Sequence, residues 1–354
     1  MAKNKKILSI VATGVLSTSL MLAGCGAAKQ GEPGAGGAAD GKKLRIAMVT
    51  DVGGVNDNSF NQSAWEGLQR AQKDLGIDAK YQESHSAEDY QPNLNSFVKA
   101  NYDLTWGIGY AMAKDLTTVA QQNPNAKLAI VDSNLDGKIP SNVEAVTFKE
   151  QEGSFLMGVI AGLMTKSNKV GFIGGVQVPL IEKFEYGFRA GVHAVNPKAT
   201  VSVAYAGAFN ASDKGKVLAA TMYDQGVDVI FPAAGATGDG VFKEAKERGA
   251  GKWVIGVDRD QSYLAPDNTL SSMVKHVDVA VYTVAKDLKA GKWNGGHELT
   301  LGLKDDGVGY APTTNKHVPA DVLKKVDDFK QKIINGEIKV PSTKAEFDAF
   351  VAGK

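Results

Sequence analysis

The stretch Leu44-Arg-Ile-Ala-Met-Val-Thr50 is a nearly continuous apolar run, and a polar loop and a helical pattern from Asn61 to Leu75 follow it. Gly76 ends the helical pattern, as glycine commonly does after a last helical turn. A strand, a loop and a helix in this order form the repeating unit of a parallel sheet. A strand that is apolar on both faces suits a sheet covered by helices on both sides. The stretch therefore predicts an α/β fold.

The same unit recurs along the rest of the chain, with helical patterns between most of the strands. We expect further strands at Ala79–Gln82, Leu104–Gly109, Leu128–Val131, Val143–Phe148, Val170–Ile173, Val201–Ala206, Val227–Phe231, Val254–Val257 and Leu270–Val274. A chain of 354 residues is longer than one hydrophobic core usually organises. We therefore predict two lobes, each a doubly wound parallel sheet.

Composition narrows the class of partner. The chain has 40 Lys and Arg against 39 Asp and Glu, so it lacks the basic excess of a nucleic-acid-binding protein. Cys25 is the single cysteine, which excludes an internal disulfide and metal sites built on several cysteines. We expect a fold stabilised by its core and no nucleic-acid partner.

Residues 1–24 have the features of a secretion signal. Three lysines, at positions 3, 5 and 6, precede an apolar run of about 16 residues. The run ends in Leu22-Ala23-Gly24-Cys25, which resembles the lipobox of lipoproteins. We therefore predict cleavage before Cys25, lipidation of its thiol and a lipid anchor on the extracytoplasmic face of the cell membrane. The alternative, a transmembrane anchor, needs roughly 20 apolar residues.

Residues 25–43 are mostly Gly, Ala and polar or charged residues. Such a composition buries too little apolar surface to offset the entropy lost on ordering. We interpret this segment as a flexible tether between the anchor and the folded lobes.

The loops that follow the strands are the candidates for a site, because ligands of doubly wound sheets bind beyond the carboxyl ends of the strands. In this chain those loops carry acidic, amide and aromatic side chains. The candidate ligand-binding residues are Asp51, Asn56, Asp57, Phe60, Asn61, Asp132, Phe209, Gly235, Asp258 and Lys275.

Conventional enzyme signatures are missing from the sequence. The five histidines show no HExxH or other metal-binding spacing, and there is neither a GxSxG elbow nor a GxxxxGK[ST] phosphate loop. We therefore expect a protein that is not an enzyme and that needs no metal and no cofactor.

Phe60 and Phe209 stand in polar loops, where an aromatic ring leaves apolar surface exposed unless it packs on something. The two come from units far apart in the sequence, so they can face each other across a cleft between the lobes. A base held between them would gain roughly 1–3 kcal/mol per stacked face, by analogy with nucleic-acid platforms. Alternatively, each ring anchors its own loop.

The loop after the first strand is rich in carboxylates and amides. Asp51 or Asp57 can cap the helix that begins near Phe60, which is a common role for aspartate. A cap explains one of these carboxylates and leaves the rest of the loop unexplained. Together the loop side chains offer donors and acceptors to the polar edge of a purine or pyrimidine; they are Asp51, Asn56, Asp57, Asn58 and Asn61.

Charge balance in the predicted cleft points to an uncharged ligand. Asp258 offers two oxygens to a pair of vicinal ribose hydroxyls, and Lys275 either donates to a ribose oxygen or neutralises the acids. With Asp51, Asp57 and Asp132 nearby, a phosphate would meet several buried like charges. An unphosphorylated nucleoside therefore fits better than a nucleotide.

Several segments in the same order resemble the basic membrane protein family of bacterial lipoproteins, which includes purine nucleoside receptors of ABC transporters. The resemblance runs from about Leu44 to the C-terminus. Its motifs are the lipobox, Asp51-Val-Gly-Gly-Val-Asn-Asp-Asn-Ser-Phe-Asn61, Trp65-Glu-Gly67, Gly107-Ile-Gly-Tyr-Ala-Met112, Glu152-Gly-Ser-Phe-Leu-Met-Gly158 and Ile255-Gly-Val-Asp258.

The resemblance implies the type I periplasmic-binding-protein fold, a nucleoside ligand and an ABC transporter permease as partner. It implies that Phe60 and Phe209 sandwich the base while Asp51 and Asn61 contact its polar edge, with Asn56 and Asp57 in the same loop. It further implies that Asp258 and Lys275 bind ribose hydroxyls and that Asp132 and Gly235 complete the lining.

The family's fold also implies three crossings between lobes joined by a hinge. We expect these crossings near 148–151, near Lys275 and near 308–313. The expected lobe limits are 44–149 plus 276–308 for the first lobe and 150–275 plus 309–354 for the second.

Three alternatives stay open at this point. The same fold can bind another small solute, such as a sugar, because aromatic rings also stack on sugars. A surface lipoprotein can use its exterior to bind a macromolecule, with the cleft secondary. A nucleoside-processing enzyme is the least favoured, since acids around a ribose can assist cleavage of the glycosidic bond.

Overall fold

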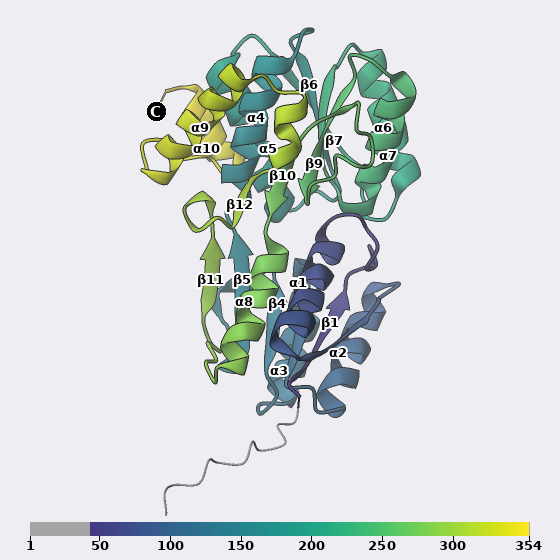
Figure 1. Ribbon diagram of the computed structural model, residues 1–354, viewed down its shortest axis with the longest axis vertical. Helices are drawn as coiled ribbons and strands as arrows, with labels where there is room; N and C mark the ends of the chain where they lie inside the picture. The colour runs from purple at the N-terminus through teal and green to yellow at the C-terminus, as the bar shows by residue number, and fades with distance from the viewer. Residues whose placement is uncertain (1–42, 354) are drawn as a thin grey trace, which may run out of the picture. The chain divides into compact units, whose positions relative to one another are not determined.

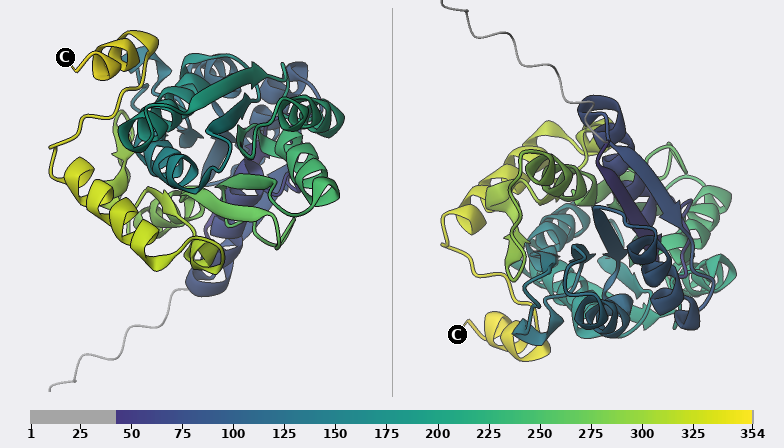
Figure 2. Two further views of the ribbon diagram at one scale, coloured as in Figure 1. Left: turned by 90° about the horizontal axis from the view of Figure 1, so that it is seen from above. Right: turned by 90° about the horizontal axis from the view of Figure 1, so that it is seen from below.

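The computed structural model describes residues 43–353. The predicted signal peptide, the predicted lipidation site Cys25 and all but the last residue of the predicted tether lie outside these residues. The described part contains two six-stranded sheets, each with helices on both faces (Figure 1, Figure 2). The predicted α/β class and the two parallel-sheet lobes are confirmed.

The first sheet defines lobe 1, and its strand order is β11-β5-β4-β3-β1-β2. All of its neighbouring strands run parallel. Its strands are β1 (Arg45–Thr50), β2 (Asp78–Gln82), β3 (Leu104–Ile108), β4 (Leu128–Val131), β5 (Val143–Phe148) and β11 (Glu298–Leu301). Its helices are α1 (Phe60–Leu75), α2 (Tyr90–Lys99), α3 (Ala113–Gln122) and α8 (Val277–Lys289).

Strand β1 shows why its sequence is apolar throughout. Ile46 and Met48 belong to the core that includes residues of α1 and α8. Ala47 and Val49 point the other way, into the core formed with α2 and α3. Because successive side chains alternate between the faces of a strand, both faces of β1 are buried. Strand β1 runs parallel to β2 and β3, so Asp51, which follows its last residue, lies at the carboxyl edge of the sheet.

The second sheet defines lobe 2, with strand order β12-β10-β9-β8-β6-β7. Its edge strand β12 runs antiparallel to β10. Its strands are β6 (Lys169–Gly174), β7 (Thr200–Tyr205), β8 (Val229–Ala233), β9 (Trp253–Asp258), β10 (Thr269–Lys275) and β12 (Val308–Tyr310). Its helices are α4 (Glu150–Met164), α5 (Pro179–Val195), α6 (Ser212–Asp224), α7 (Gly238–Arg248), α9 (Ala320–Ile334) and α10 (Lys344–Val351).

Helices α4 and α5 lie backbone to backbone because glycines face each other. A Cβ on Gly158 would lie 2.1 Å from the carbonyl oxygen of Phe188, and a Cβ on Gly191 would lie 2.0 Å from that of Phe155. No side chain fits in such a contact, so both positions require glycine. The close packing holds α5 beside the pocket described below.

Three strands differ from the sequence prediction by more than one residue or were not predicted. Strand β8 begins at Val229 rather than Val227, because the Val227 amide donates to the Met222 carbonyl in the turn after α6. The short strands β11 and β12 were not predicted, since their few residues take extended form by pairing with β5 and β10.

The chain crosses between the two sheets three times. The first crossing is Lys149, between β5 and α4, and the second is His276, between β10 and α8. The third is 302–307, between β11 and β12. It lies just before the expected 308–313, because Val308–Tyr310 already pairs with β10 in the second sheet.

Candidate functional site

A pocket with an empty volume of about 560 Å³ lies between the lobes at the carboxyl ends of the strands. This volume counts all space between the lining atoms, including open solvent at the mouth of the pocket. Residues lining it include Asp51, Gly53, Asp57, Phe60, Gly109, Tyr110 and Asp132 from lobe 1. Lobe 2 and the second crossing contribute Leu180, Ile181, Phe184, Phe209, Ala233, Ala234, Gly235, Ala236, Val257, Asp258 and Lys275. Of the predicted ligand-binding residues, all but Asn56 and Asn61 are in this lining.

Asp57 caps helix α1. Its Oδ1 accepts hydrogen bonds from the backbone amides of Ser59 (2.9 Å) and Gln62 (3.1 Å), and its Oδ2 accepts from the amide of Asn61 (2.9 Å). The burial of this carboxyl raises its pKa to about 7, against the lowering effect of the amide donors. Because both oxygens of Asp57 accept hydrogen bonds from backbone amides, we assign this residue the role of capping α1. Asn56 is exposed and lies outside the lining.

Asn61 holds Asp51 in place from behind. Its Nδ2 donates to Asp51 Oδ1 (2.7 Å) and to Asp57 Oδ2 (3.1 Å), and the Gly53 amide also donates to Asp51 Oδ1 (2.8 Å). A Cβ on Gly109 would lie 3.5 Å from Asp51 Oδ2, so this glycine leaves space beside that oxygen. Burial raises the pKa of the Asp51 carboxyl. Asp51 thus has one fixed oxygen and one that faces the pocket side.

The aromatic side chains of the pocket come from both lobes. Phe60 is the first residue of α1, and Phe209 lies in the loop after β7. Phe209 packs on Gly175, where a Cβ would lie 2.3 Å from the ring. Tyr110 of lobe 1 meets Phe209 edge-on across the pocket, with ring centroids 6.4 Å apart. The two phenylalanines can therefore contact one ligand from opposite lobes.

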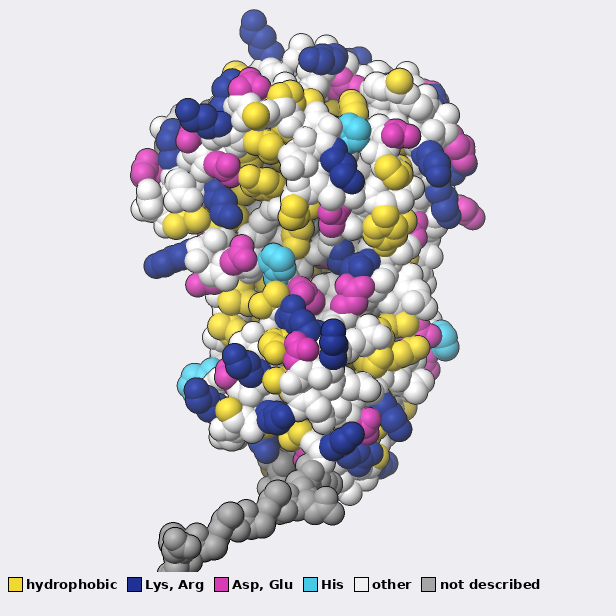
Figure 3. Space-filling view, viewed as in Figure 1, with side chains coloured by type: hydrophobic (Ala, Val, Ile, Leu, Met, Phe, Trp, Pro, Cys, Tyr) yellow, Lys and Arg dark blue, Asp and Glu magenta, His cyan; other side chains and the backbone are white. Residues whose placement is uncertain are grey.

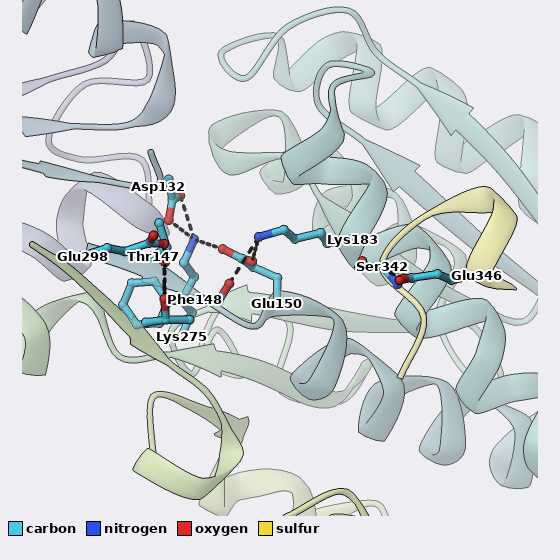
Figure 4. Close-up of polar contacts among 10 residues, drawn as sticks. Asp132, Thr147, Phe148, Glu150, Lys183, Lys275, Glu298, Ser342 and Glu346 are labelled. Atoms are coloured by element: carbon cyan, nitrogen blue, oxygen red, sulfur yellow. Dashed lines mark hydrogen bonds and ion pairs between the residues drawn. The ribbon is translucent and has the colours of Figure 1, made fainter. Parts of the chain in front are cut away.

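Lys275 is the centre of a buried charge cluster at the crossings. Its Nζ lies 2.6 Å from Asp132 Oδ1 and 3.2 Å from Glu150 Oε1. The other Glu150 oxygen lies 3.2 Å from Lys183 Nζ on α5 (Figure 4). Lys275 is 1% exposed and Glu150 0%. The cluster consists of Asp132, Glu150, Lys183 and Lys275, and it connects lobe 1 to lobe 2 through two crossings.

Aromatic rings surround the Lys275 ammonium. Its Nζ lies 5.1 Å from the ring centroid of Phe60, 5.0 Å from that of Phe148 and 5.7 Å from that of Phe184. Such cation–π contacts favour a desolvated cation. The same ring of Phe60 therefore faces both the pocket and the charge cluster.

Burial acts on the ionisation of this cluster, and neighbouring charges oppose it. Burial alone would lower the pKa of Lys275, but Asp132, Glu150 and Asp258 raise it above its usual value. Burial raises the pKa of Asp132 to about 6, although the Lys275 ammonium opposes the shift. Burial also raises the pKa of Asp258. Lys275 therefore stays protonated and is a donor at neutral pH.

Asp132 and Asp258 both stand at strand ends in the left-handed region, with φ of 69° and 64°. Non-glycine residues adopt this conformation at a cost, and such residues gather at functional sites. Ser59 Oγ of lobe 1 donates to Asp258 Oδ2 of lobe 2 over 2.5 Å. The turned backbone thus presents each carboxylate to the other lobe.

The predicted ligand-binding residues do not include Glu150, Tyr110 or the apolar wall of Leu180, Ile181 and Phe184. Tyr110 had a signal, because it follows β3 in the same way that Asp132 follows β4. Glu150 had a weaker one, since an acidic first residue of a helix is ordinary. The wall had none, because its residues look like the buried face of α5.

Within residues 43–353, the structure shows no helix with the length and apolarity needed to cross a membrane. The same residues contain no group of three or more His, Cys, Asp or Glu side chains arranged to bind a metal ion.

Comparison with protein families matches residues 44–344 to a family described as ABC transporter substrate-binding protein PnrA-like. The chain belongs to this family. Basic membrane protein A of Borreliella burgdorferi is 37% identical over 87% of this chain and 90% of its own. The resemblance to the basic membrane protein family is therefore confirmed.

Two further proteins extend the comparison. A Lactococcus lactis protein named ABC transporter nucleoside-binding protein BmpA is 39% identical over 96% of this chain and 99% of its own. The crystal structure of an ABC transporter solute-binding protein from Aeropyrum pernix has a TM-score of 0.79 and 30% identity, and covers 88% of this chain and 98% of its own. The type I fold is confirmed, and the protein is an ABC transporter substrate-binding protein.

Proposed function

We propose that this substrate-binding protein captures a purine nucleoside between its lobes and delivers it to an ABC transporter permease. In this proposal, lipid on Cys25 anchors the protein at the extracytoplasmic face of the cell membrane. The observation that carries the ligand assignment is that Phe60 and Phe209, from opposite lobes, line one pocket together with buried carboxylates. The named activity of the Lactococcus relative agrees with it.

The base would stack between Phe60 and Phe209. Aromatic stacking of a base is worth roughly 1–3 kcal/mol, and it needs no charge on the ligand. Asp51, with one oxygen held by Asn61 and Gly53, would accept a hydrogen bond from the edge of the base. Tyr110, edge-on to Phe209, would limit the space beside that edge.

The ribose would lie toward Asp258 and Lys275. Ser59 occupies Asp258 Oδ2, which leaves Oδ1 as the acceptor for a hydroxyl. Lys275 has three protons and donates to Asp132 Oδ2 (2.7 Å), while Glu150 Oε1 is an ion-pair partner at 3.2 Å, so a proton remains for a ribose oxygen. Charge-assisted bonds of this kind are roughly twice as strong as neutral ones.

The charges of the site disfavour a phosphate. Asp51, Asp132, Glu150 and Asp258 bring four carboxylates into or beside the pocket, against Lys275 and Lys183. Lys275 and Lys183 are already engaged with carboxylates. The phosphate of a nucleotide would therefore bring further negative charge into a pocket whose two nearby cations are already paired with carboxylates.

Capture follows from contacts that exist only when the lobes are together. A ligand shifts the equilibrium toward the closed form only by binding that form more tightly. Phe60 and Asp51 on one side, with Phe209 and Asp258 on the other, supply such differential contacts. The closed form would then be presented to the permease, and reopening would release the nucleoside.

Isothermal titration tests the ligand. The soluble form beginning at residue 26 is unfolded and refolded to remove bound ligand, then titrated with nucleosides, their monophosphates and sugars. We expect tight binding of purine nucleosides and none of monophosphates. Phe209→Ala should weaken binding, whereas Phe347→Ala, whose ring packs on Tyr186 away from the pocket, should not. Binding of sugars alone would contradict the proposal.

Fractionation tests the anchor. The full-length chain should be recovered with membranes and should incorporate labelled fatty acid. The Cys25→Ser variant should lose the label. Labelling that persists in this variant would exclude Cys25 as the lipid attachment site.

A further inference from the structure

Asn58 connects the lobes without touching the pocket. Its Nδ2 donates to Asp239 Oδ2 (3.0 Å), and its Oδ1 accepts from the hydroxyl of Tyr263 (2.9 Å). Its carbonyl oxygen accepts from Nε2 of Gln261 (2.9 Å). All three partners belong to lobe 2. Asn58 has φ of 56°, and this left-handed conformation suits asparagine better than most side chains.

A second interlobe contact lies beside Asn58. Arg259 of lobe 2 donates from Nη2 to Glu66 Oε1 (2.6 Å) and from Nε to Glu66 Oε2 (3.1 Å). Two parallel bonds of this kind fix the geometry of both side chains. We call Asn58, Glu66, Asp239, Arg259, Gln261 and Tyr263 the interlobe latch.

The latch is well placed to act on closure. Its residues are outside the pocket lining, so a ligand does not replace their contacts. Its lobe 2 loop begins directly after Asp258, the strand-end residue that Ser59 also contacts from lobe 1. Separation of the lobes must break every latch contact, because each joins lobe 1 to lobe 2.

We infer that Asn58 is a positioning residue that sets ligand affinity by stabilising the closed arrangement of the lobes. Contacts that exist only in the closed form raise the population of the closed form. The apparent affinity for a ligand is proportional to that population, because the closed form is the one that binds tightly. Because Asn58 does not touch the ligand, it changes affinity equally for every ligand of the pocket. This inference uses the proposed function only for the choice of nucleosides as probes.

Asn58→Gly is the sharpest test, because glycine keeps the left-handed backbone and removes both side-chain bonds. We expect the dissociation constants of guanosine and adenosine to rise by at least about tenfold each, the factor for losing one neutral hydrogen bond and one bond to the Asp239 carboxylate from the closed form. The increase should appear in the dissociation rate. Asn101→Gly is the matched control, since Asn101 has φ of 55° and is exposed on lobe 1.

A second readout needs no ligand. Cys25 is the only cysteine, so the soluble form lacking it accepts a pair of spin labels through Lys80→Cys and Lys214→Cys. These exposed positions lie on β2 and α6, near the sheet edges farthest from the crossings. Without added nucleoside, Asn58→Gly should shift the distance distribution toward longer values, and Asn101→Gly should not.

The outcomes separate the two proposals. Unchanged affinity and an unchanged distance distribution in Asn58→Gly would overturn the latch. A change in the ratio of the guanosine and adenosine constants would also overturn it, because it would show direct contact with the ligand. Failure of every nucleoside to bind the wild type would overturn the proposed function, and the distance distributions would still decide the latch.

Discussion

The two regions where the lobes meet differ in burial and in the kind of charge they carry. At the crossings, the side chains of Lys275, Asp132 and Glu150 are enclosed, at 2%, 6% and 0% exposed, and Lys183 extends from them toward solvent at 33%. At the latch, the Glu66 and Arg259 side chains are 42% and 18% exposed. On the face drawn in Figure 3, acidic and basic side chains are interspersed over the surface.

The difference in burial separates two kinds of control. An enclosed ion pair that loses one partner leaves a charge that water cannot solvate, so the cluster must stay intact. An exposed pair loses little, because water replaces the missing partner. The cluster therefore determines whether the pocket forms and binds, and the latch determines how long the lobes stay together.

Lys275→Met should have the largest effect. The change leaves Asp132, Glu150 and Asp258 without their shared cation. We expect loss of detectable nucleoside binding and a decrease of about 3–5 kcal/mol in the free energy of unfolding, measured with urea. Lys216→Met, at an exposed pair with Glu247, should leave both unchanged. Normal stability in Lys275→Met would contradict the assignment of an obligatory charge.

Phe60→Ala should come next. It removes one stacking face and one of the rings around Lys275. We expect the dissociation constant for guanosine to rise about 10- to 100-fold, since stacking contributes roughly 1–3 kcal/mol. Titration calorimetry measures the change. An equal loss with ribose, which has no base, would show that the ring acts through Lys275 rather than by stacking.

The pH dependence of binding tests the cluster without a mutation. Burial raises the pKa of Asp132 to about 6, so this carboxyl is ionised at pH 7.5 and mostly protonated at pH 5. Protonation removes an acceptor from Lys275 and the pocket. We expect the dissociation constant for guanosine to rise by about tenfold as the pH falls from 7.5 to 5. Asp132→Asn should remove the part of the profile near pH 6 and leave any part that comes from Asp57, whose pKa is about 7. A flat profile in the wild type would contradict the role of the Asp132 carboxylate.

The Glu66–Arg259 pair should have the smallest effect. Glu66→Gln or Arg259→Met should raise the dissociation constant by about threefold, within the range of exposed ion pairs. The double variant should be no weaker than the single ones, which a double-mutant cycle measures. Additive losses would show that the two side chains act independently.

The sequence predicted the edge of the sheet where the site lies. The apolar strands fixed the direction of β1, β4 and β9, and the residues that follow them, Asp51, Asp132 and Asp258, line one pocket. This succeeded because parallel strands place their carboxyl ends along one edge. The apolar pattern of each strand is therefore enough to predict that these side chains lie at the carboxyl ends of the strands.

Which asparagine of the first loop makes important contacts depends on partners in the other lobe, and the local sequence does not reveal those partners. Asn56 was a predicted ligand contact and is exposed, whereas Asn58, which the sequence only grouped with the other polar residues of the loop, makes three interlobe bonds. The positive φ of Asn58 turns the loop, and that turn is stabilised by partners in lobe 2. Glu150 was missed for the same reason, because its partner Lys275 lies on a distant strand.

Native mass spectrometry of a competition tests the central claim most directly. The refolded wild-type protein is mixed with equal amounts of guanosine, guanosine monophosphate, ribose and galactose, and the retained ligand is identified by its mass. The account predicts that guanosine alone is retained, by a pocket that stacks a base and repels phosphate. Retention of the monophosphate or of a sugar in place of guanosine would contradict it.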